Sequence, residues 1–321
     1  MSVAFVFPGQ GSQEVGMGKA MADAYPSARA VFDAADRALG DKQPLSELCF
    51  EGPLESLTLT ANTQPAILTS SIACLAALRE KLPHLTPVMV AGHSLGEYSA
   101  LVCAGALAFD DTVRLVRLRG QAMQDAVASG TGAMAAIMGL DADGVAAVCA
   151  EVREAMPGRV VEAANFNAPG QVVVAGHADA VARAGEIVAT RKGRAIPLKV
   201  SAPFHCSLMK PAADRLADAL DTVHVSPLKF PVVANIDATP NSDPARVKAL
   251  LVAQVAGTVR WEQCVAAMIA AGVTTFVEIG SGKVLAGLIK RVSKQVVVHN
   301  VSDPTSLEAL SGVLSASAFT T

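Results

Sequence analysis

The sequence predicts an α/β fold, because short apolar runs alternate along the chain with long alanine-rich stretches of helical pattern. The runs at residues 3–7, 88–91 and 274–279 are bounded by Gly or Pro, as expected of parallel strands that are buried on both faces. The chain has 321 residues, of which 51% are hydrophobic, and this composition supports a sizeable core. We therefore expect these runs to be strands of a parallel sheet covered by helices.

A second, smaller unit is predicted between these strands, at residues 129–200. It contains three strand-like runs and two helical segments, at 133–138, 144–155, 171–175, 178–190 and 195–200. That order resembles a split βαβ unit of the ferredoxin-like kind. We therefore expect a core formed by residues 1–128 and 201–321, and a small subdomain formed by residues 129–200.

The run at 88–91 leads into Gly-His-Ser-Leu-Gly at residues 92–96, which has the pattern of a nucleophile elbow around Ser94. Glycines are needed on both sides because a side chain there would collide with the neighbouring elements. A helix predicted from Leu95 to about Leu107 would place its positive end beneath the hydroxyl. Ser94 and Glu97 also fit a capping box, which requires no chemistry. The strand before and the helix after favour the elbow.

A serine nucleophile needs a base, and His205 is the best candidate among the six histidines. It follows the apolar run that ends at Val200, and a doubly wound sheet presents catalytic side chains just after its strands. His93 is less suitable, because adjacent side chains at a strained turn point in different directions. A hydrogen-bonded structural histidine is the alternative for His205. No carboxylate is evident as a third member, so a backbone carbonyl could orient the imidazole.

Arg119 is predicted to lie on the buried face of a helix. At about 100° per residue, it falls inside the apolar arc that contains Val116 and Met123, whereas Arg114 and Arg117 fall on the polar side and are expected to be solvated. A buried arginine keeps its charge and must be paired. Its partner could be an internal carboxylate or an anionic ligand, and the pattern alone leaves both open.

Composition argues against several classes of function. The net charge of −3 gives no broad excess of Lys and Arg, so we predict no nucleic-acid binding. The longest apolar stretch, residues 56–78, is interrupted by Asn62, Gln64 and Pro65, so we predict no membrane span. The first residues lack a basic region and a cleavage site, so we predict a cytoplasmic protein without a secretory signal.

The sequence contains no complete motif for binding a metal or a nucleotide. The six cysteines are scattered without a C-x-x-C pair and the histidines are dispersed, which predicts reduced thiols and no metal site. Gly9 to Gly11 follows a strand, but Glu14 replaces the third glycine of a dinucleotide motif. Residues 280–283 resemble a P-loop, but Val277 and Val284 replace the required Gly and Ser/Thr. No cofactor is predicted.

Several motifs lie in an order and spacing that one enzyme family shares. They are Phe7 to Gln13, Gly92 to Tyr98, Arg119, Asn165 to Asn167, Pro203 to His205, and Gln254 with Trp261. The sequence resembles, over nearly its whole length, the stand-alone bacterial form of the malonyl-CoA:acyl carrier protein transacylase family. The resemblance implies an α/β-hydrolase-like parallel-sheet core with an inserted ferredoxin-like α+β subdomain.

The resemblance also implies roles for individual residues. Arg119 would bind the malonyl carboxylate, and the main-chain carbonyl of Gln254 would orient His205. The backbone N–H groups of Gln10 and Leu95 would form the oxyanion hole. Both lie at turns that follow a strand, where N–H groups are free.

The function that the resemblance implies is two-step acyl transfer for fatty acid synthesis. Ser94, deprotonated by His205, would take malonyl from malonyl-CoA and pass it to the phosphopantetheine thiol of acyl carrier protein. Asn165 and Phe204 would contact the substrate, and Phe204 is similar to its counterpart in malonyl-selective members. We expect a monomer. The alternative is an α/β-hydrolase-type serine esterase or thioesterase, which would need a carboxylate third member and leaves Arg119 without a role.

Two basic clusters are candidate contacts for an acidic carrier protein. They are Arg191, Lys192 and Arg194 in the small subdomain, and Lys283, Lys290 and Arg291 in the core. The alternative is that these side chains are ordinary solvated charges.

Overall fold

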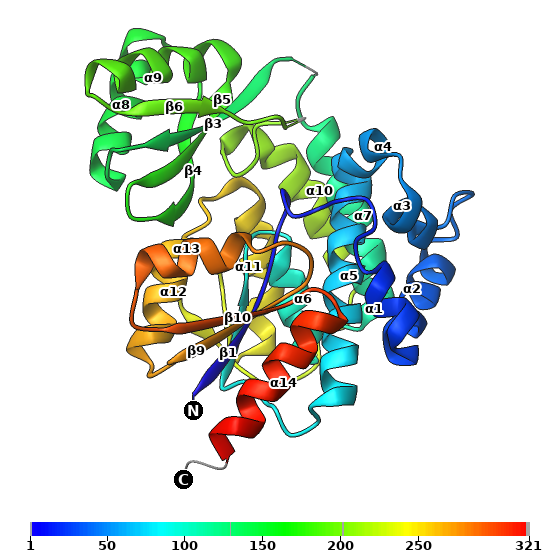
Figure 1. Cartoon of the computed structure of the whole chain (residues 1–321). Helices are drawn as coiled ribbons and strands as arrows, with labels where there is room; N and C mark the ends of the chain where they lie inside the picture. Colours follow the sequence, from blue (N-terminus) through cyan, green and yellow to red (C-terminus); the bar gives the residue numbers. More distant parts are fainter. Residues whose placement is uncertain (1, 129, 201, 319–321) are drawn as a thin grey trace.

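The computed structural model describes residues 2–128, 130–200 and 202–318, which are arranged around two β-sheets (Figure 1). The larger sheet has the strand order β10-β9-β1-β2-β7-β8. Its strands are β1 (Val3–Phe7), β2 (Met89–Gly92), β7 (Val232–Val233), β8 (Pro240–Asn241), β9 (Thr275–Ile279) and β10 (Val297–Val301). Neighbouring strands are parallel except β7 and β8, which are antiparallel. The three predicted apolar runs are the adjacent strands β1, β2 and β9, and their bounds differ from the prediction by at most one residue.

Side chains of β1 alternate between two cores, one on each face of the larger sheet. Val3, Phe5 and Phe7 belong to one core, and Ala4 and Val6 belong to the other. Successive side chains of a strand point to opposite faces, so this alternation requires apolar cover on both. Helices supply that cover on both faces of the sheet.

Many helices cover the first face of the larger sheet, and α12 and α13 cover the second face. The first core takes side chains from α1 (Lys19–Ala24), α2 (Pro26–Leu39), α3 (Leu45–Glu51), α4 (Leu54–Thr58), α5 (Thr60–Lys81), α6 (Gly96–Cys103), α7 (Phe109–Asp125), α10 (Lys210–Asp221), α11 (Pro244–Ala256) and α14 (Pro304–Ala318). The second core takes them from α12 (Trp261–Ala270) and α13 (Val284–Val292). A short 3-10 helix, η1 (Ser207–Met209), precedes α10. Of the helices the structure describes, none combines the length and the apolar character that crossing a membrane would require.

The smaller sheet is antiparallel and lies at one end of the molecule (Figure 1). Its strands, in the order β4-β5-β3-β6, are β3 (Gly132–Met138), β4 (Val161–Ala168), β5 (Gln171–His177) and β6 (Arg194–Pro197). Two helices, α8 (Ala142–Ala155) and α9 (Ala178–Thr190), share a separate hydrophobic core with it. Side chains on the other face, among them Met134 and Val173, join the first core of the larger sheet. The predicted boundary residues 129 and 201 lie outside the described residues.

Three sequence predictions about these elements are wrong. The small sheet has four strands, not three: β4 was missed because register shifts at Ala163/Asn165 and Phe166/Ala168 break the alternation of apolar and polar residues. β6 ends at Pro197 rather than at 200, and a proline is tolerated there because β6 is an edge strand. The helix after Ser94 ends at Cys103 rather than Leu107, because Gly105 adopts the left-handed conformation with φ 75°.

Candidate active site

Ser94 lies at the sharp turn between β2 and α6, with a left-handed φ of 50°. A Cβ on Gly92 would lie 2.0 Å from the Gly96 carbonyl carbon, and one on Gly96 would lie 2.1 Å from the Phe7 carbonyl oxygen. Both glycines are therefore required by steric exclusion, as the sequence predicted. A non-glycine residue held in this conformation costs about 1–3 kcal/mol, a strain typical of functional sites.

The capping-box alternative for Ser94 is wrong. The residue in the cap position of α6 is Leu95, and no side chain caps the helix there. The Ser94 hydroxyl instead lies 2.7 Å from Nε2 of His205. The Glu97 carboxylate points elsewhere and accepts hydrogen bonds from Asn235 N and Gln254 Nε2.

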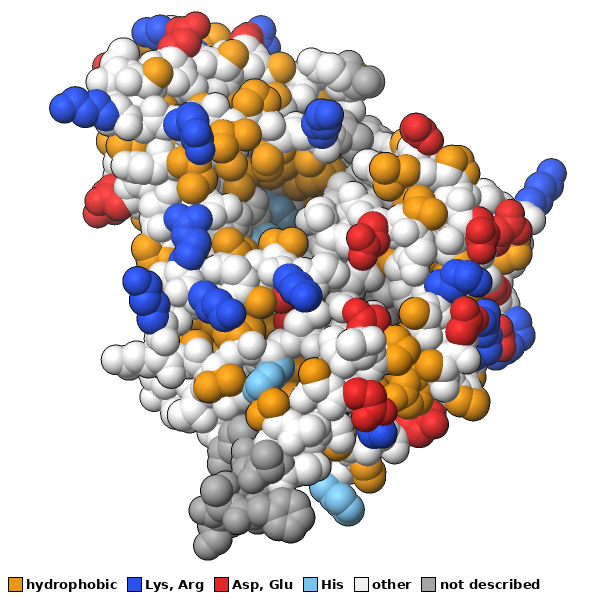
Figure 2. Space-filling view, in the orientation of Figure 1, with side chains coloured by type: hydrophobic (Ala, Val, Ile, Leu, Met, Phe, Trp, Pro, Cys, Tyr) orange, Lys and Arg blue, Asp and Glu red, His pale blue; other side chains and the backbone are white. Residues whose placement is uncertain are grey.

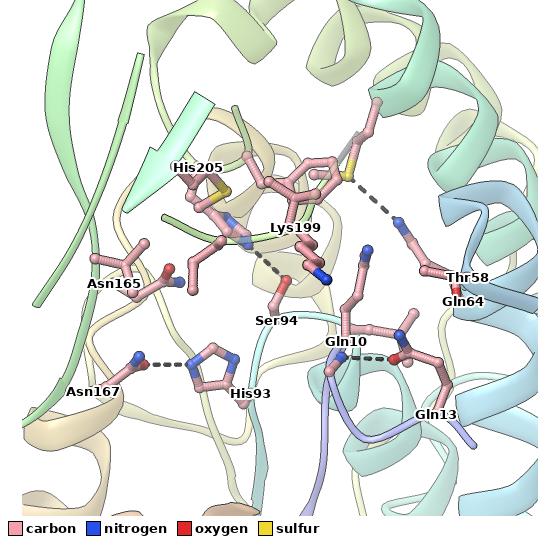
Figure 3. Close-up of a pocket in the computed structure, with 18 of the residues that line it drawn as sticks. Gln10, Gln13, Thr58, Gln64, His93, Ser94, Asn165, Asn167, Lys199 and His205 are labelled. Carbon is pink, nitrogen blue, oxygen red and sulfur yellow. Dashed lines mark hydrogen bonds between the residues drawn. The ribbon is translucent and has the colours of Figure 1, made fainter. Parts of the chain in front are cut away.

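His205 is oriented as a base toward Ser94 (Figure 3). Its Nδ1 lies 2.9 Å from the main-chain carbonyl oxygen of Gln254, so the hydrogen bond that the resemblance implied is present. A carbonyl can only accept, so Nδ1 carries the proton and Nε2 keeps a lone pair for the Ser94 O–H. Burial, and then the positive charge of Arg119, lowers the pKa of His205 to about 3. The imidazole is therefore neutral, and able to accept a proton, at pH 7.

The predicted location of His205, just after a strand of the parallel sheet, is nevertheless wrong. The preceding strand, β6, is an edge strand of the small antiparallel sheet and does not belong to the parallel sheet. His205 is instead held on the segment that returns from the small sheet to the core, with a left-handed φ of 60°. The segment between β6 and η1 turns at this residue, and the turn points the imidazole at the elbow.

Arg119 is buried in α7, as the helical arc predicted, and only 2% of its surface is exposed. Its guanidinium donates to Gln64 Oε1 at 2.7 Å, to Gln254 Oε1 at 2.9 Å and to Ser94 Oγ at 3.2 Å. Among the described residues it forms no direct ion pair; the carboxylate of Glu97 acts on it at longer range, through its charge and through Gln254, which contacts both side chains. All its hydrogen-bond acceptors are neutral, and Nε has none. The arrangement leaves a buried positive charge facing Ser94.

The two neighbouring arginines of α7 differ from each other. Arg114 is exposed and pairs with Asp111, as a solvated charge should. The prediction for Arg117 is wrong in part, because its side chain is only 16% exposed and donates to Asn62 and Asp41.

The N–H groups of Gln10 and Leu95 are both available for an oxyanion. In the described part of the chain, neither donates to a protein acceptor. Gln10 follows β1 and Leu95 follows Ser94, and β1 and β2 are adjacent, so the two turns lie at the same edge of the larger sheet. This arrangement is suited to stabilising negative charge next to the serine.

The reactive groups line a cavity of about 290 Å³. Its wall includes Ser94, His205, Arg119 and the predicted substrate contacts Asn165 and Phe204. Figure 3 shows the Asn165 side chain directed into the cavity. It has no hydrogen-bond partner among the described residues, whereas the neighbouring Asn167 lies 2.8 Å from Nε2 of His93. No group of three or more potential metal ligands occurs in the described residues.

Sequence reasoning missed two amide side chains that hold the site. Gln64 accepts from Arg119, and Asn235 accepts from the Ser94 N–H at 2.6 Å. The sequence weakly indicated Gln64, since it is a polar residue inside an apolar helix. It did not indicate Asn235, because the preceding strand, β7, has only two residues and shows no recognisable pattern.

The Ser–His pair, the two free backbone N–H groups and the buried cation form a site suited to acyl transfer through a serine. Residues 4–313 match the family model described as acyl transferase domain. The chain is 49% identical over 307 residues to a malonyl CoA-acyl carrier protein transacylase of Bacillus subtilis, covering 95% of each chain. The chain therefore belongs to the malonyl-CoA:acyl carrier protein transacylase family.

Solved structures agree with this relationship. An acyl-carrier-protein S-malonyltransferase of Burkholderia pseudomallei is 52% identical with a TM-score of 0.92, covering 97% of this chain and 99% of that one. A malonyl-transacylase solved in complex with a type II PKS acyl-carrier protein is 44% identical with a TM-score of 0.92, covering 96% and 98%.

Proposed function

We propose that this protein transfers a malonyl group from malonyl-CoA to the phosphopantetheine thiol of acyl carrier protein, through a malonyl-serine intermediate, and so supplies fatty acid synthesis. The observation that carries this proposal is the buried Arg119, without an ion pair among the described residues, beside the Ser94–His205 pair. Malonyl-CoA has a carboxylate at the end opposite its thioester. One acyl group can therefore meet both the cation and the nucleophile.

In the first half-reaction, Nε2 of His205 takes the Ser94 hydroxyl proton while Oγ attacks the thioester carbonyl carbon. The carbonyl oxygen becomes an oxyanion, which accepts hydrogen bonds from the N–H groups of Gln10 and Leu95. Collapse of this tetrahedral species breaks the carbon–sulfur bond. The departing sulfur takes the proton from His205, and coenzyme A leaves as a thiol.

The second half-reaction uses the same groups in reverse. The carrier thiol gives its proton to His205 and attacks the malonyl-serine ester, forming a new carbon–sulfur bond. The Ser94–acyl bond breaks, and Oγ recovers the proton from His205. No redox change or cofactor enters either step.

Arg119 holds the malonyl carboxylate during both steps. Its guanidinium donates to two glutamine carbonyls, Gln64 and Gln254, which fix its plane beside Ser94. A planar guanidinium can bind a carboxylate through two parallel N–H bonds, which gives orientation as well as charge. Asn165, directed into the cavity without a partner among the described residues, would donate to the acyl or pantetheine carbonyls, and Phe204 would limit the space beside the acyl chain.

Acyl carrier protein would dock through Lys and Arg side chains of the two predicted basic clusters. Figure 2 shows Lys and Arg side chains along one side of the hollow in the molecular surface. Arg191 already pairs with Glu151 at 2.6 Å, and Arg291 donates to Gln171 and to the Pro169 carbonyl. The other four candidates, Lys192, Arg194, Lys283 and Lys290, form no ion pair in the part of the chain that the structure describes. We therefore assign docking to these four.

We also assign the small sheet and its helices to a subdomain inserted in the core. The order β3-α8-β4-β5-α9-β6 with pairing β4-β5-β3-β6 supports a ferredoxin-like subdomain at residues 129–200, inserted in an α/β-hydrolase-like core of residues 1–128 and 201–321. The monomeric state and the cytoplasmic location stay predictions from the sequence.

Mass spectrometry of the intact protein after mixing with malonyl-CoA tests the function. We expect one covalent malonyl group, which disappears when holo acyl carrier protein is added and is recovered on the carrier thiol. Release of free malonate instead of malonyl-carrier would contradict transfer and would identify a thioesterase.

A further inference from the structure

We propose that Glu97 is a positioning residue, whose buried carboxylate holds the nucleophile, the base and the arginine in one arrangement through the amides Asn235 and Gln254. This inference rests on the proposed function, because it assigns a role in the acyl-transfer reaction. Glu97 is 2% exposed and does not line the cavity. It therefore acts through the residues that it contacts and not on the substrate.

Asn235 holds the elbow at both of its ends. Its Oδ1 accepts from the Ser94 N–H at 2.6 Å, and its Nδ2 donates to the Gly92 carbonyl at 2.8 Å. β7 ends just before Asn235 and pairs with β2, so the amide continues that pairing with a side chain where the backbone ladder stops. These two bonds restrain the left-handed conformation that projects the Ser94 hydroxyl toward the cavity.

Gln254 contacts all three reactive groups. Its Nε2 donates to the Ser94 carbonyl at 3.0 Å, its Oε1 accepts from Arg119 at 2.9 Å, and its main-chain oxygen accepts from His205 at 2.9 Å. A glutamine amide can present either end to a neighbour. Its direction must therefore be determined by a group that only accepts or only donates.

In its ionised form Glu97 is such a group, because a carboxylate accepts and cannot donate, and it favours the same Gln254 orientation as the donor-only guanidinium of Arg119. Its Oε2 accepts from the Asn235 N–H at 2.8 Å and from Gln254 Nε2 at 2.9 Å. The second bond directs Nε2 toward Glu97, which leaves Oε1 for Arg119. One oxygen atom thus places the residue that supports the elbow and the residue that orients the base and the arginine.

The cost of this carboxylate indicates a role beyond packing. Burial raises the pKa of Glu97 to about 7, against the two N–H donors and the charge of Arg119. An apolar residue of similar volume would fill the space without that desolvation cost. Both of the hydrogen bonds that Glu97 accepts come from residues that hold the site, so this carboxylate orients polar partners as well as filling space.

Glu278 in β9 provides a matched control. It is 0% exposed, and its carboxylate also accepts two N–H groups, from Leu285 at 3.0 Å and from Ala286 at 2.8 Å. Burial likewise raises its pKa to about 7. Its partners lie at the start of α13, and it contacts none of the reactive groups, so Glu278→Met removes an equivalent buried carboxylate from elsewhere in the fold.

The test compares Glu97→Met, Glu97→Gln, Asn235→Ala and Glu278→Met with the wild type. Ser94 acylation by malonyl-CoA and by acetyl-CoA is followed by intact mass, and each rate is expressed per site that can finally be acylated. The melting temperature of each protein is measured alongside. Unfolded protein then lowers the number of sites without changing the rate per site.

We expect Glu97→Met to lower the acylation rate per site about 10²-fold, as misplaced reacting groups do. It should also reduce the preference for malonyl over acetyl, because Arg119 loses its fixed partner. Asn235→Ala should slow both substrates alike and keep that preference. Glu97→Gln keeps an accepting oxygen and should recover much of the loss, remaining about tenfold slow. Glu278→Met should melt earlier with an unchanged rate per site.

Two results would overturn the inference. If Glu97→Met matches Glu278→Met in both rate per site and preference, Glu97 only stabilises the fold. If Glu97→Met does not fold, Glu97→Gln decides, and a rate per site equal to that of the wild type rejects a positioning role. A wild-type protein that malonyl-CoA does not acylate would instead reject the proposed function itself.

Discussion

The two walls of the cavity contribute different things. The core wall presents Ser94 and Arg119, each held by hydrogen bonds to buried amides. The facing wall includes the apolar Met134 and Val173 of the small sheet, with Leu198 just after it, and the polar Asn165 of β4. Figure 3 shows the elbow serine opposite the His205 segment, which joins the two walls.

The two walls differ because the core carries the reactive groups, whereas the small sheet mainly encloses the cavity. Turns at the carboxyl ends of the adjacent parallel strands β1 and β2 bring free N–H groups and a strained serine together. The small sheet places apolar side chains opposite the elbow, and a less polar environment strengthens the electrostatic interactions of the core wall. Changes to the core wall should therefore affect the reaction far more than changes to the facing wall.

The largest expected effect is the loss of the nucleophile from the core wall. Malonyl-CoA should leave one malonyl group on the wild type and none on Ser94→Ala, as measured by intact mass. Met134→Leu, a change of similar volume on the facing wall, should still accept a malonyl group. Peptide mapping that finds the label on a cysteine would contradict the assignment; all six cysteines are buried, and burial raises the pKa of Cys74 and Cys206 to about 12.

Removing the cation should have the next largest effect and should depend on the substrate. Arg119→Ala leaves the malonyl carboxylate buried and unpaired, a penalty of about 3–5 kcal/mol, which corresponds to roughly two to four decades in rate. Acetyl-CoA has no carboxylate, so its transfer should persist or increase. Both rates and the melting temperature should be measured, because equal loss of both substrates in a protein that melts early would indicate a structural role.

The buried His205, on the segment that joins the two walls, should make the stability of the protein depend on pH. His205 has a folded pKa of about 3, below its unfolded value of about 6.5. The unfolded chain therefore binds a proton between these values while the folded protein does not, so stability falls as pH falls through this window. Between pH 7 and pH 5 the wild type should lose about 2 kcal/mol more than His205→Gln.

That difference can be measured by urea unfolding of both proteins at each pH. A loss of the same size in the two proteins would show that His205 does not keep a depressed pKa in the folded state.

The smallest effect is expected at the outer surface, where the two walls should contribute comparably. Reversing Lys283 and Lys290 on the core, or Lys192 and Arg194 on the small sheet, should lower transfer to acyl carrier protein by up to about tenfold, because exposed charges are weak and screened. The wild-type rate should fall with added salt more steeply than that of the variants. Acylation by malonyl-CoA alone should not change, and carrier transfer that survives reversal of both pairs would reject docking at these residues.

Local rules predicted the central features of this site correctly. The elbow could be recognised from the five residues 92–96, although the structure shows that Gly92 is required by the turn itself and Gly96 by the close approach of Phe7 in β1. The period of the helix placed Arg119 on the buried face. The prediction failed where alternation was broken, at the bulged strand β4, and where a strand was assigned to the wrong sheet before His205.

The sequence by itself determined the parallel strands, the elbow serine and the buried arginine, since each follows from a short motif or from the periodicity of one element. Only the tertiary structure decided which groups hold them. Gln254 and Asn235 contact Ser94 although they are more than 140 residues away in the sequence. The Glu97 carboxylate accepts hydrogen bonds from these two residues and does not cap its own helix. Hydrogen-bond partners so far apart in sequence are chosen by the packing of whole elements, and no local pattern records that choice.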